Sequence, residues 1–203
     1  MGNLEGLKGC GTALITPFLP GGGLDEKALE TLVSWQIQEG MHFLVPCGTT
    51  GESPTPQHDE HLAVVDVTLK TVRKRVPIIA GAGGNDTAKI IRLIAELKQL
   101  GVDGILSVSP YYNKPTQEGI YQHFLALAES TDLPIIVYNV PGRTGSNILP
   151  DTLLRLSQIP NIAGVKEASG DISQIGEICT KAPAGFRILS GDDSLTLPVI
   201  ALG

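Results

Sequence analysis

The sequence predicts an α/β fold built from repeated β/α units, and three observations support this fold class. Short apolar runs recur at intervals of roughly 30 residues, the length of one β/α repeat. Segments with helical periodicity lie between these runs. Several runs are apolar at consecutive residues, for example Ile135–Val137, as is typical of parallel strands that are covered on both faces.

Seven segments are expected to form strands, because each is short, apolar and bounded by Gly, Pro, Ser or Asn. In chain order they are Gly11–Phe18, His42–Cys47, Pro77–Gly81, Gly104–Ser109, Pro134–Asn139, Ile162–Ala168 and Arg187–Gly191.

Helices are expected between these strands, where apolar residues follow a period of 3.6. Asp86 or Thr87 can cap a helix whose apolar stripe runs from Ile90 to Leu100, and Gly101 ends it. The other predicted helices carry the stripes Leu29–Ile37 (stopped by Gly40), Leu62–Val72 and Ile120–Leu127, with a shorter helix beginning near Pro150.

Two architectures fit this pattern: an open doubly wound sheet and a closed (β/α)8 TIM barrel. The glycines Gly21–Gly23 lack the spacing of a dinucleotide-binding loop. Polar residues instead follow at least four different strands, which is where barrel enzymes place their active sites. We therefore expect a single barrel domain over residues 1–203, incomplete because the pattern stops after the seventh strand.

Composition excludes several classes of protein. The net charge of −6 argues against a nucleic-acid partner. No apolar run is long enough to span a membrane, and residues Met1–Glu5 do not resemble a secretory signal. Cys10, Cys47 and Cys179 are odd in number and widely spaced, as expected for reduced thiols in the cytoplasm. His58 and His61 lack a third ligand, so neither a metal nor a cofactor is expected.

Lys166 is the strongest candidate for chemistry, because it follows the apolar run Ile162–Val165 at a strand end. Removal from water would lower the pKa of its ammonium group and leave a nucleophilic amine. The competing interpretation is a solvated lysine paired with Glu167.

Polar groups after two other strands are further candidates. In Gly48–Glu52, backbone N–H groups and the hydroxyls of Thr49 and Thr50 could bind a carboxylate, although an ordinary turn has the same composition. After the fifth strand, Tyr138 could move protons and Arg143 could clamp a carboxylate, although Tyr138 could equally be a packing residue.

Tyr111 and Tyr112 stand together after the fourth strand. Two adjacent aromatic side chains in a loop predict a contact surface, and an oligomer interface is the favoured interpretation.

Taken together, these segments resemble the dihydrodipicolinate synthase family, which belongs to the pyruvate-dependent aldolase barrels. The matching stretches occur in family order and span the chain: Gly11–Ala13, Gly48–Glu52, Ser109–Pro115, Tyr138–Pro141 with Arg143–Gly145, Val165–Ala168 and Ser190–Asp193.

The resemblance implies a role for each site residue. Lys166 would form a Schiff base with pyruvate, and a relay of hydroxyl groups would shuttle protons. The relay would consist of Tyr138, Thr49 and Tyr112, the last reaching in from a neighbouring subunit of a homotetramer made of two dimers. The implied substrate-binding residues are Thr50 for the pyruvate carboxylate, Arg143 for the carboxylate of the second substrate, and Gly191.

The implied reaction condenses pyruvate with L-aspartate 4-semialdehyde to 4-hydroxy-tetrahydrodipicolinate, in diaminopimelate and lysine biosynthesis. Arg143 favours this reaction, because relatives that cleave N-acetylneuraminate typically lack an arginine at this point of the motif. Aldolases of 2-keto-3-deoxy sugar acids remain an alternative, as does a non-catalytic homologue. A flavin- or phosphate-binding barrel is a more distant one.

The resemblance also implies a feedback pocket for lysine, and one position in it departs from the family. The matching residues are Ser53, His58, His61, Asn85 and Tyr111, whereas Lys89 stands where a glutamate often binds the ammonium of the inhibitor. Like charges repel, so weak inhibition by lysine is expected. Members of the family are about one and a half times as long as this chain, so an eighth β/α unit and a C-terminal helical domain are expected to be absent.

Overall fold

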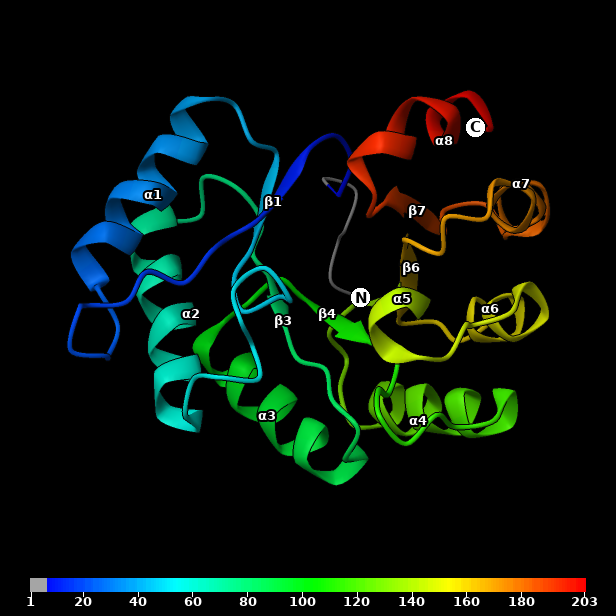
Figure 1. Ribbon diagram of the computed structural model, residues 1–203, viewed down its shortest axis with the longest axis horizontal. Helices are drawn as coiled ribbons and strands as arrows, with labels where there is room; N and C mark the ends of the chain where they lie inside the picture. The colour runs from blue at the N-terminus through cyan, green and yellow to red at the C-terminus, as the bar shows by residue number, and fades with distance from the viewer. Residues whose placement is uncertain (1–6) are drawn as a thin grey trace. The chain divides into compact units, whose positions relative to one another are not determined.

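The computed structural model describes residues 7–203 (Figure 1). These residues form two compact units, which are described separately. The N-terminal unit contains residues 7–82 and 92–106, and the C-terminal unit contains residues 83–91 and 107–203. Strand β4 (Gly104–Val108) and helix α3 (Thr87–Leu100) each run from one unit into the other.

The N-terminal unit is built on parallel strands. Strand β1 (Gly11–Ala13) pairs with β2 (Phe43–Val45), and β3 (Ile79–Gly81) pairs with the start of β4. A bridge between Leu44 and Ile78 joins β2 to the β3 segment. The helices of this unit are α1 (Glu26–Gln38), α2 (His58–Val72) and the C-terminal part of α3.

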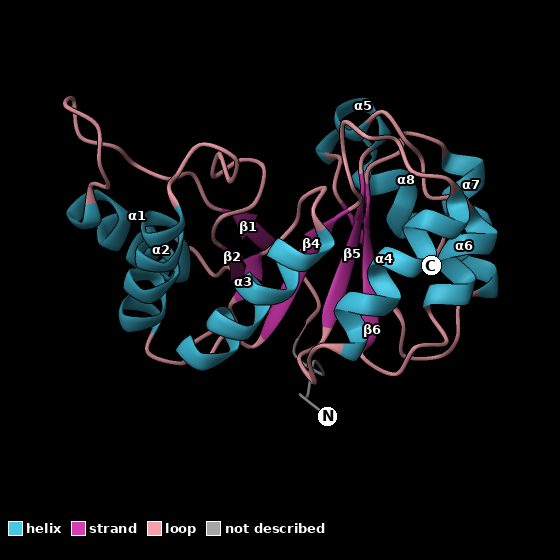
Figure 2. Ribbon diagram, turned by 90° about the horizontal axis from the view of Figure 1, so that it is seen from below, coloured by secondary structure: helices cyan, strands magenta, loops and turns pink. Residues whose placement is uncertain are grey.

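The C-terminal unit continues the same parallel pattern. Strand β5 (Ile135–Asn139) lies between the end of β4 and β6 (Ile162–Glu167), and β6 also pairs with β7 (Arg187–Ser190). Figure 2 shows helices α4, α6 and α7 on one side of β5 and β6. The helices of this unit are α4 (Gln117–Glu129), α5 (Pro141–Thr144), α6 (Pro150–Leu156), α7 (Ile172–Lys181), the 3-10 turn η2 (Asp193–Leu195) and α8 (Thr196–Ala201).

The register between β5 and β6 positions the candidate site. Tyr138 stands opposite Lys166, and Asn139 stands opposite Glu167. Successive side chains in a strand point to opposite faces of the sheet. The pair Tyr138–Lys166 therefore lies on one face, and the pair Asn139–Glu167 lies on the other.

All seven predicted strands form within residues 7–203, and each is shorter than predicted. The largest difference is in the first strand, which ends at Ala13 and not at Phe18. Phe18 instead forms an antiparallel bridge with Leu24, and the turn between them contains Gly22 and Gly23 at positive φ. Glycine adopts this conformation without steric strain, so the chain reverses its direction between Phe18 and Leu24.

The helix boundaries follow the predicted capping chemistry. Asp86 accepts a hydrogen bond from the backbone N–H of Lys89, and α3 begins at Thr87. Pro150 is the first residue of α6, as predicted. The short helix α5 was not predicted, because four residues are too few to show a periodic pattern. No helix within residues 7–203 is both long and apolar enough to cross a bilayer.

One glycine in the N-terminal unit is required for close packing between neighbouring strands. A Cβ atom added to Gly81 would lie 2.0 Å from the carbonyl oxygen of Cys47. The backbone N–H of Gly81 donates to the carbonyl oxygen of Pro46 at 2.9 Å. A side chain here would force β3 away from the segment that leads into the Gly48–Glu52 turn.

Candidate active site

Lys166 lies on β6 between two groups that enclose its aliphatic stem. Its Nζ atom is 4.5 Å from the centroid of the Tyr138 ring. On the β7 side, a Cβ atom added to Gly191 would lie 2.9 Å from Cε of Lys166. The lysine is half-buried, and the absence of a side chain at residue 191 leaves room for it.

These surroundings change the acid–base chemistry of the amine. Burial lowers the pKa of Lys166, and the negative charge of Asp193 partly opposes this by raising it. Burial disfavours the charged form of an amine, so a larger fraction of Lys166 is neutral at a given pH than for a lysine in water. A neutral amine is the nucleophilic form.

Tyr138 is 7% exposed, and its ring faces the Lys166 amine. Burial raises the pKa of its phenol, and the positive charge of Arg143 in α5 works in the opposite direction. The phenol is therefore protonated near neutral pH and lies beside the amine. A protonated phenol can donate a proton and then accept one back from a reacting group.

Glu167 does not pair with Lys166, so that competing interpretation of the sequence is wrong. Its carboxylate lies on the opposite face of β6, where Oε1 accepts a hydrogen bond from the backbone N–H of Ser169 at 2.7 Å. Both carboxylate oxygens also accept from Nδ2 of Asn139, at 3.2 and 3.1 Å. Alternation along the strand separates the two neighbouring charges.

The Gly48–Glu52 segment forms a tight turn after β2 in the N-terminal unit, with Thr49 and Thr50 exposed. Backbone N–H groups of this segment bond to carbonyl oxygens within the turn: Gly51 to Gly48, and Glu52 to Thr49. These two N–H groups are therefore not available to an anion. The side chains of Thr49 and Thr50 are exposed, so a ligand could contact their hydroxyl groups.

Thr16 bonds to this turn, and the buried Cys47 directly precedes it. The hydroxyl of Thr16 donates to the carbonyl oxygen of Gly51 at 2.7 Å. Cys47 is 1% exposed, and burial raises the pKa of its thiol to about 12. Because the thiolate is the reactive form of cysteine, Cys47 is unreactive in this setting and acts as a packing residue.

Tyr112 lies in the turn after β4 and projects into solvent. Its exposed fraction is 88%, and its backbone φ of 73° is in the left-handed region. The side-chain Nδ2 of the next residue, Asn113, donates to the carbonyl oxygen of Asn85 at 3.3 Å. The contact surface stays a prediction, and Tyr112 would present its exposed ring to it.

The residues of the predicted lysine pocket divide between the two units. His58 begins α2, and its Nε2 atom lies 2.9 Å from Oε2 of Glu96. His61 is buried, and burial lowers its pKa. The pocket itself therefore stays a prediction, with Ser53, His58 and His61 in the N-terminal unit and Asn85, Lys89 and Tyr111 in the C-terminal unit.

Sequence reasoning missed a set of buried amides behind the candidate site. Asn139 and Gln174 are buried, and both join a hydrogen-bond network that ends at Glu167. The alternation of side chains along a strand could have indicated this set. If Tyr138 and Lys166 face the site, then Asn139 and Glu167 face the other side of the sheet, where buried polar groups need hydrogen-bond partners.

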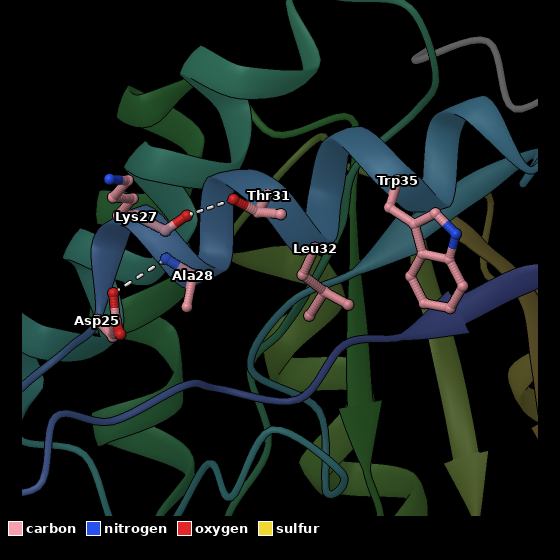
Figure 3. A pocket seen from close by; sticks show the side chains of 6 residues that line it. All are labelled: Asp25, Lys27, Ala28, Thr31, Leu32 and Trp35. Carbon is pink, nitrogen blue, oxygen red and sulfur yellow. Dashed lines mark hydrogen bonds between the residues drawn. The ribbon is translucent and has the colours of Figure 1, made fainter.

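A shallow hollow of about 530 Å³ lies along α1 and is unrelated to the predicted residues. Figure 3 shows the side chains around it, which all come from α1 and its capping residue: Asp25, Lys27, Ala28, Thr31, Leu32 and Trp35. None of the predicted site residues lines this hollow. Among residues 7–203, no group of three or more His, Cys, Asp or Glu side chains could hold a metal ion.

Known proteins resemble this chain closely in both sequence and structure. The chain is 57% identical over 198 residues to the 4-hydroxy-tetrahydrodipicolinate synthase of Koribacter versatilis, covering 97% of this chain and 66% of that protein. A chloride-inhibited dihydrodipicolinate synthase from Acinetobacter baumannii, solved in complex with pyruvate, has a TM-score of 0.95 at 46% identity. The enzyme from Cyanidioschyzon merolae, solved with lysine bound, has a TM-score of 0.93 at 42% identity.

These two solved structures are covered over 68% and 66% of their lengths, and this chain over 97% and 96% of its own. The chain therefore spans about two thirds of the length of such relatives. Together with the succession of parallel β/α units, the likeness assigns the chain to the TIM-barrel class. A more particular assignment follows from the match of residues 6–203 to a single family. The chain belongs to the dihydrodipicolinate synthetase family.

Proposed function

We propose that this chain belongs to an enzyme that condenses pyruvate with L-aspartate 4-semialdehyde to give 4-hydroxy-tetrahydrodipicolinate. The observation that carries the proposal is the half-buried Lys166 amine, 4.5 Å from the centroid of the Tyr138 ring, in a chain of this family. Relatives that share about half of its residues bear the name of this activity.

The proposed chemistry begins with the neutral amine of Lys166. The amine attacks the keto carbon of pyruvate, and water leaves to form an imine. The protonated imine withdraws electrons, so a proton can leave the methyl carbon and an enamine forms. The enamine carbon then bonds to the aldehyde carbon of the second substrate. Finally, the amine of that substrate attacks the imine carbon, releases Lys166 and closes the ring.

Other side chains bind the substrates or move protons in this proposal. Tyr138, Thr49 and Tyr112 relay protons between the reacting atoms and water. Thr50 binds the pyruvate carboxylate, and Arg143 binds the carboxylate of L-aspartate 4-semialdehyde. Gly191 provides the space in which the lysine stem and bound pyruvate lie.

We also propose that the active form is a homotetramer built from two dimers. The exposed ring of Tyr112 supports this, because an aromatic side chain that is 88% exposed on an ordered turn is suited to a subunit contact. The pathway is the biosynthesis of diaminopimelate and lysine, and we place the enzyme in the cytoplasm.

Feedback inhibition by lysine is expected to be weak. Lys89 is exposed at the start of α3, and its positive charge would oppose the ammonium group of lysine. Inhibition by micromolar lysine, measured as loss of turnover at fixed substrate, would contradict this expectation.

Turnover with different aldehyde substrates tests the choice of reaction. We expect rapid consumption of L-aspartate 4-semialdehyde with pyruvate, and little cleavage of a 2-keto-3-deoxy sugar acid or of N-acetylneuraminate. Faster turnover of a sugar acid would reassign the protein to another pyruvate aldolase. Absence of turnover and of pyruvate capture would indicate a non-catalytic homologue.

A further inference from the structure

A chain of polar side chains, buried except for the half-buried Asn147, joins β5, β6 and α7 on the face opposite to Lys166. Nδ2 of Asn139 donates to both carboxylate oxygens of Glu167 and to Oδ1 of Asn147, the last at 2.8 Å. Nδ2 of Asn147 donates to Oε1 of Gln174 in α7 at 2.7 Å. These four residues, Glu167, Asn139, Asn147 and Gln174, are here called the amide network.

The amide network joins the two ends of the segment 140–148, which contains α5 and is here called the Arg143 loop. Asn139 is the last residue before this loop, and Asn147 lies near its end. The side chain of Asn139 bridges the two ends, because its Nδ2 reaches Asn147 and its Oδ1 accepts from the backbone N–H of Ile148 at 3.0 Å. One asparagine thereby joins the end of β5 to residues 147 and 148, which lead into α6.

The side chains of Gln117 and Thr144 make three further hydrogen bonds at the same loop. From the start of α4, Nε2 of Gln117 donates to the carbonyl oxygen of Asn147 at 2.7 Å, and Oε1 of Gln117 accepts from the backbone N–H of Leu149. Within the loop, the hydroxyl of Thr144 donates to the carbonyl oxygen of Ser146 at 2.7 Å. Arg143 itself is exposed, so its position is set by the backbone beneath it.

The carboxylate of Glu167 anchors the network. Glu167 is 1% exposed, and burial raises its pKa, while hydrogen bonds from Ser169 and Asn139 oppose that rise. A buried carboxylate that lost these donors would be left unsatisfied, which is unfavourable. The partners of Glu167 therefore have one favourable arrangement.

We propose that the amide network positions Arg143 for the second substrate by coupling the Arg143 loop to the strand residue that follows Lys166. This inference rests on the proposed function, because it assumes that Arg143 binds the carboxylate of L-aspartate 4-semialdehyde. Asn139 and Asn147 are then positioning residues: they act through the loop and touch neither substrate. Loosening the network displaces the guanidinium group and leaves the Lys166–Tyr138 pair on the other face in place.

The variant Asn139→Asp tests the inference with almost no change of shape. It replaces the donor that faces Glu167 by a second carboxyl group in a buried site. At high pH both groups are ionised and repel each other, and at lower pH they share one proton. At pH 8, we expect the KM for L-aspartate 4-semialdehyde to rise by roughly tenfold, with capture of pyruvate within about twofold of wild type. As the pH falls towards 6, the shared proton restores a donor and this KM falls back.

A matched control is Asn161→Asp, at the opposite end of β6. Nδ2 of Asn161 donates to the carbonyl oxygens of Ala128 and Thr131 at 3.0 and 2.8 Å, away from the Arg143 loop. This variant loses a comparable set of amide hydrogen bonds. We expect it to lower the melting temperature without changing the KM for the second substrate or its dependence on pH.

Hydrogen exchange of residues 140–148 supplies a readout that does not depend on turnover. Exchange should accelerate in Asn139→Asp and stay unchanged in Asn161→Asp. If Asn139→Asp does not fold, Asn147→Leu removes the loop-side partner without adding a charge, and the same rise in KM is expected.

Each outcome distinguishes the inference from the function on which it rests. Suppose that the wild-type protein captures pyruvate and catalyses the condensation, but the folded variants of Asn139 and Asn147 keep a wild-type KM for the second substrate. The inference is then overturned and the proposed function stands. An equal rise in the KM values of both substrates would overturn it as well. Failure of wild-type protein to capture pyruvate would remove the proposed function and the inference together.

Discussion

At the scale of single residues, burial and the nearby charge of Asp193 together set the pH at which the Lys166 amine is neutral. Burial lowers the pKa of Lys166, and Asp193 raises it. Imine formation requires the neutral amine, so the rate of pyruvate capture should rise with pH through the pKa of the folded protein. We expect Asp193→Asn to shift this profile to lower pH, measured by trapping with borohydride. A shift to higher pH would show that Asp193 does not act on Lys166 in this way.

His123 provides a second prediction at the residue scale. It is 6% exposed, and burial lowers its pKa to about 4 from 6.5. The unfolded chain therefore binds more protons between these values, so the free energy of unfolding should fall as the pH drops from 6.5 to 4, by up to about 3 kcal/mol. Above pH 6.5, His123 is neutral in both the folded and the unfolded chain, so it no longer makes the free energy of unfolding depend on pH.

The variant His123→Gln can keep the hydrogen bond to the hydroxyl of Thr87, which is 2.8 Å long in the native protein. We expect urea unfolding of this variant to depend less on pH between 6.5 and 4. An unchanged dependence would assign the acid sensitivity of the fold to other groups.

At the scale of elements, the positions of the strands were predictable from the sequence and their ends were not. Apolar runs bounded by Gly, Pro, Ser or Asn located every strand. The runs are most clearly apolar in β2, β3 and β5, which are buried at every residue. The first strand ended at Ala13 and not at Phe18, and after Phe18 the positive φ of Gly22 and Gly23 reverses the direction of the chain. Hydrophobicity alone carries no information on that reversal.

The candidate site was predictable only in part, for a physical reason. The closeness of Lys166 and Tyr138 followed from placing both at the carboxyl ends of parallel strands. The amide network did not follow, because Asn147 and Gln174 lie in a loop and a helix, and their contacts depend on tertiary packing. The roles of Thr49, Thr50, Tyr112 and Arg143 in catalysis or substrate binding stay predictions.

The close approach of β3 to the chain after β2 leads to a prediction about the fold. In Gly81→Ala, the new methyl group would meet the carbonyl oxygen of Cys47. We expect a loss of stability of about 1–3 kcal/mol in denaturant unfolding, as for other overpacked sites. Gly21→Ala is the matched control, because a Cβ atom there has no neighbour within 4 Å. Equal stability of the two variants would contradict the packing argument.

At the scale of the whole molecule, the proposed sharing of Tyr112 between subunits predicts complementation. Lys166→Ala and Tyr112→Phe should each lose most activity when assayed alone. In a mixed dimer, one site would combine an intact Lys166 with an intact Tyr112 from the neighbouring subunit. Refolding the two variants together should therefore restore part of the wild-type turnover. No recovery, with mixed oligomers demonstrated by mass, would mean that Tyr112 does not serve a neighbouring site.

The central claim is that Lys166 forms a covalent imine with pyruvate. The most direct measurement is the intact mass of the protein after incubation with pyruvate and borohydride, followed by peptide mapping. The account predicts one reduced pyruvyl group per chain, located on Lys166, and none in Lys166→Ala. An unmodified wild-type chain, or the same adduct in Lys166→Ala, would contradict it.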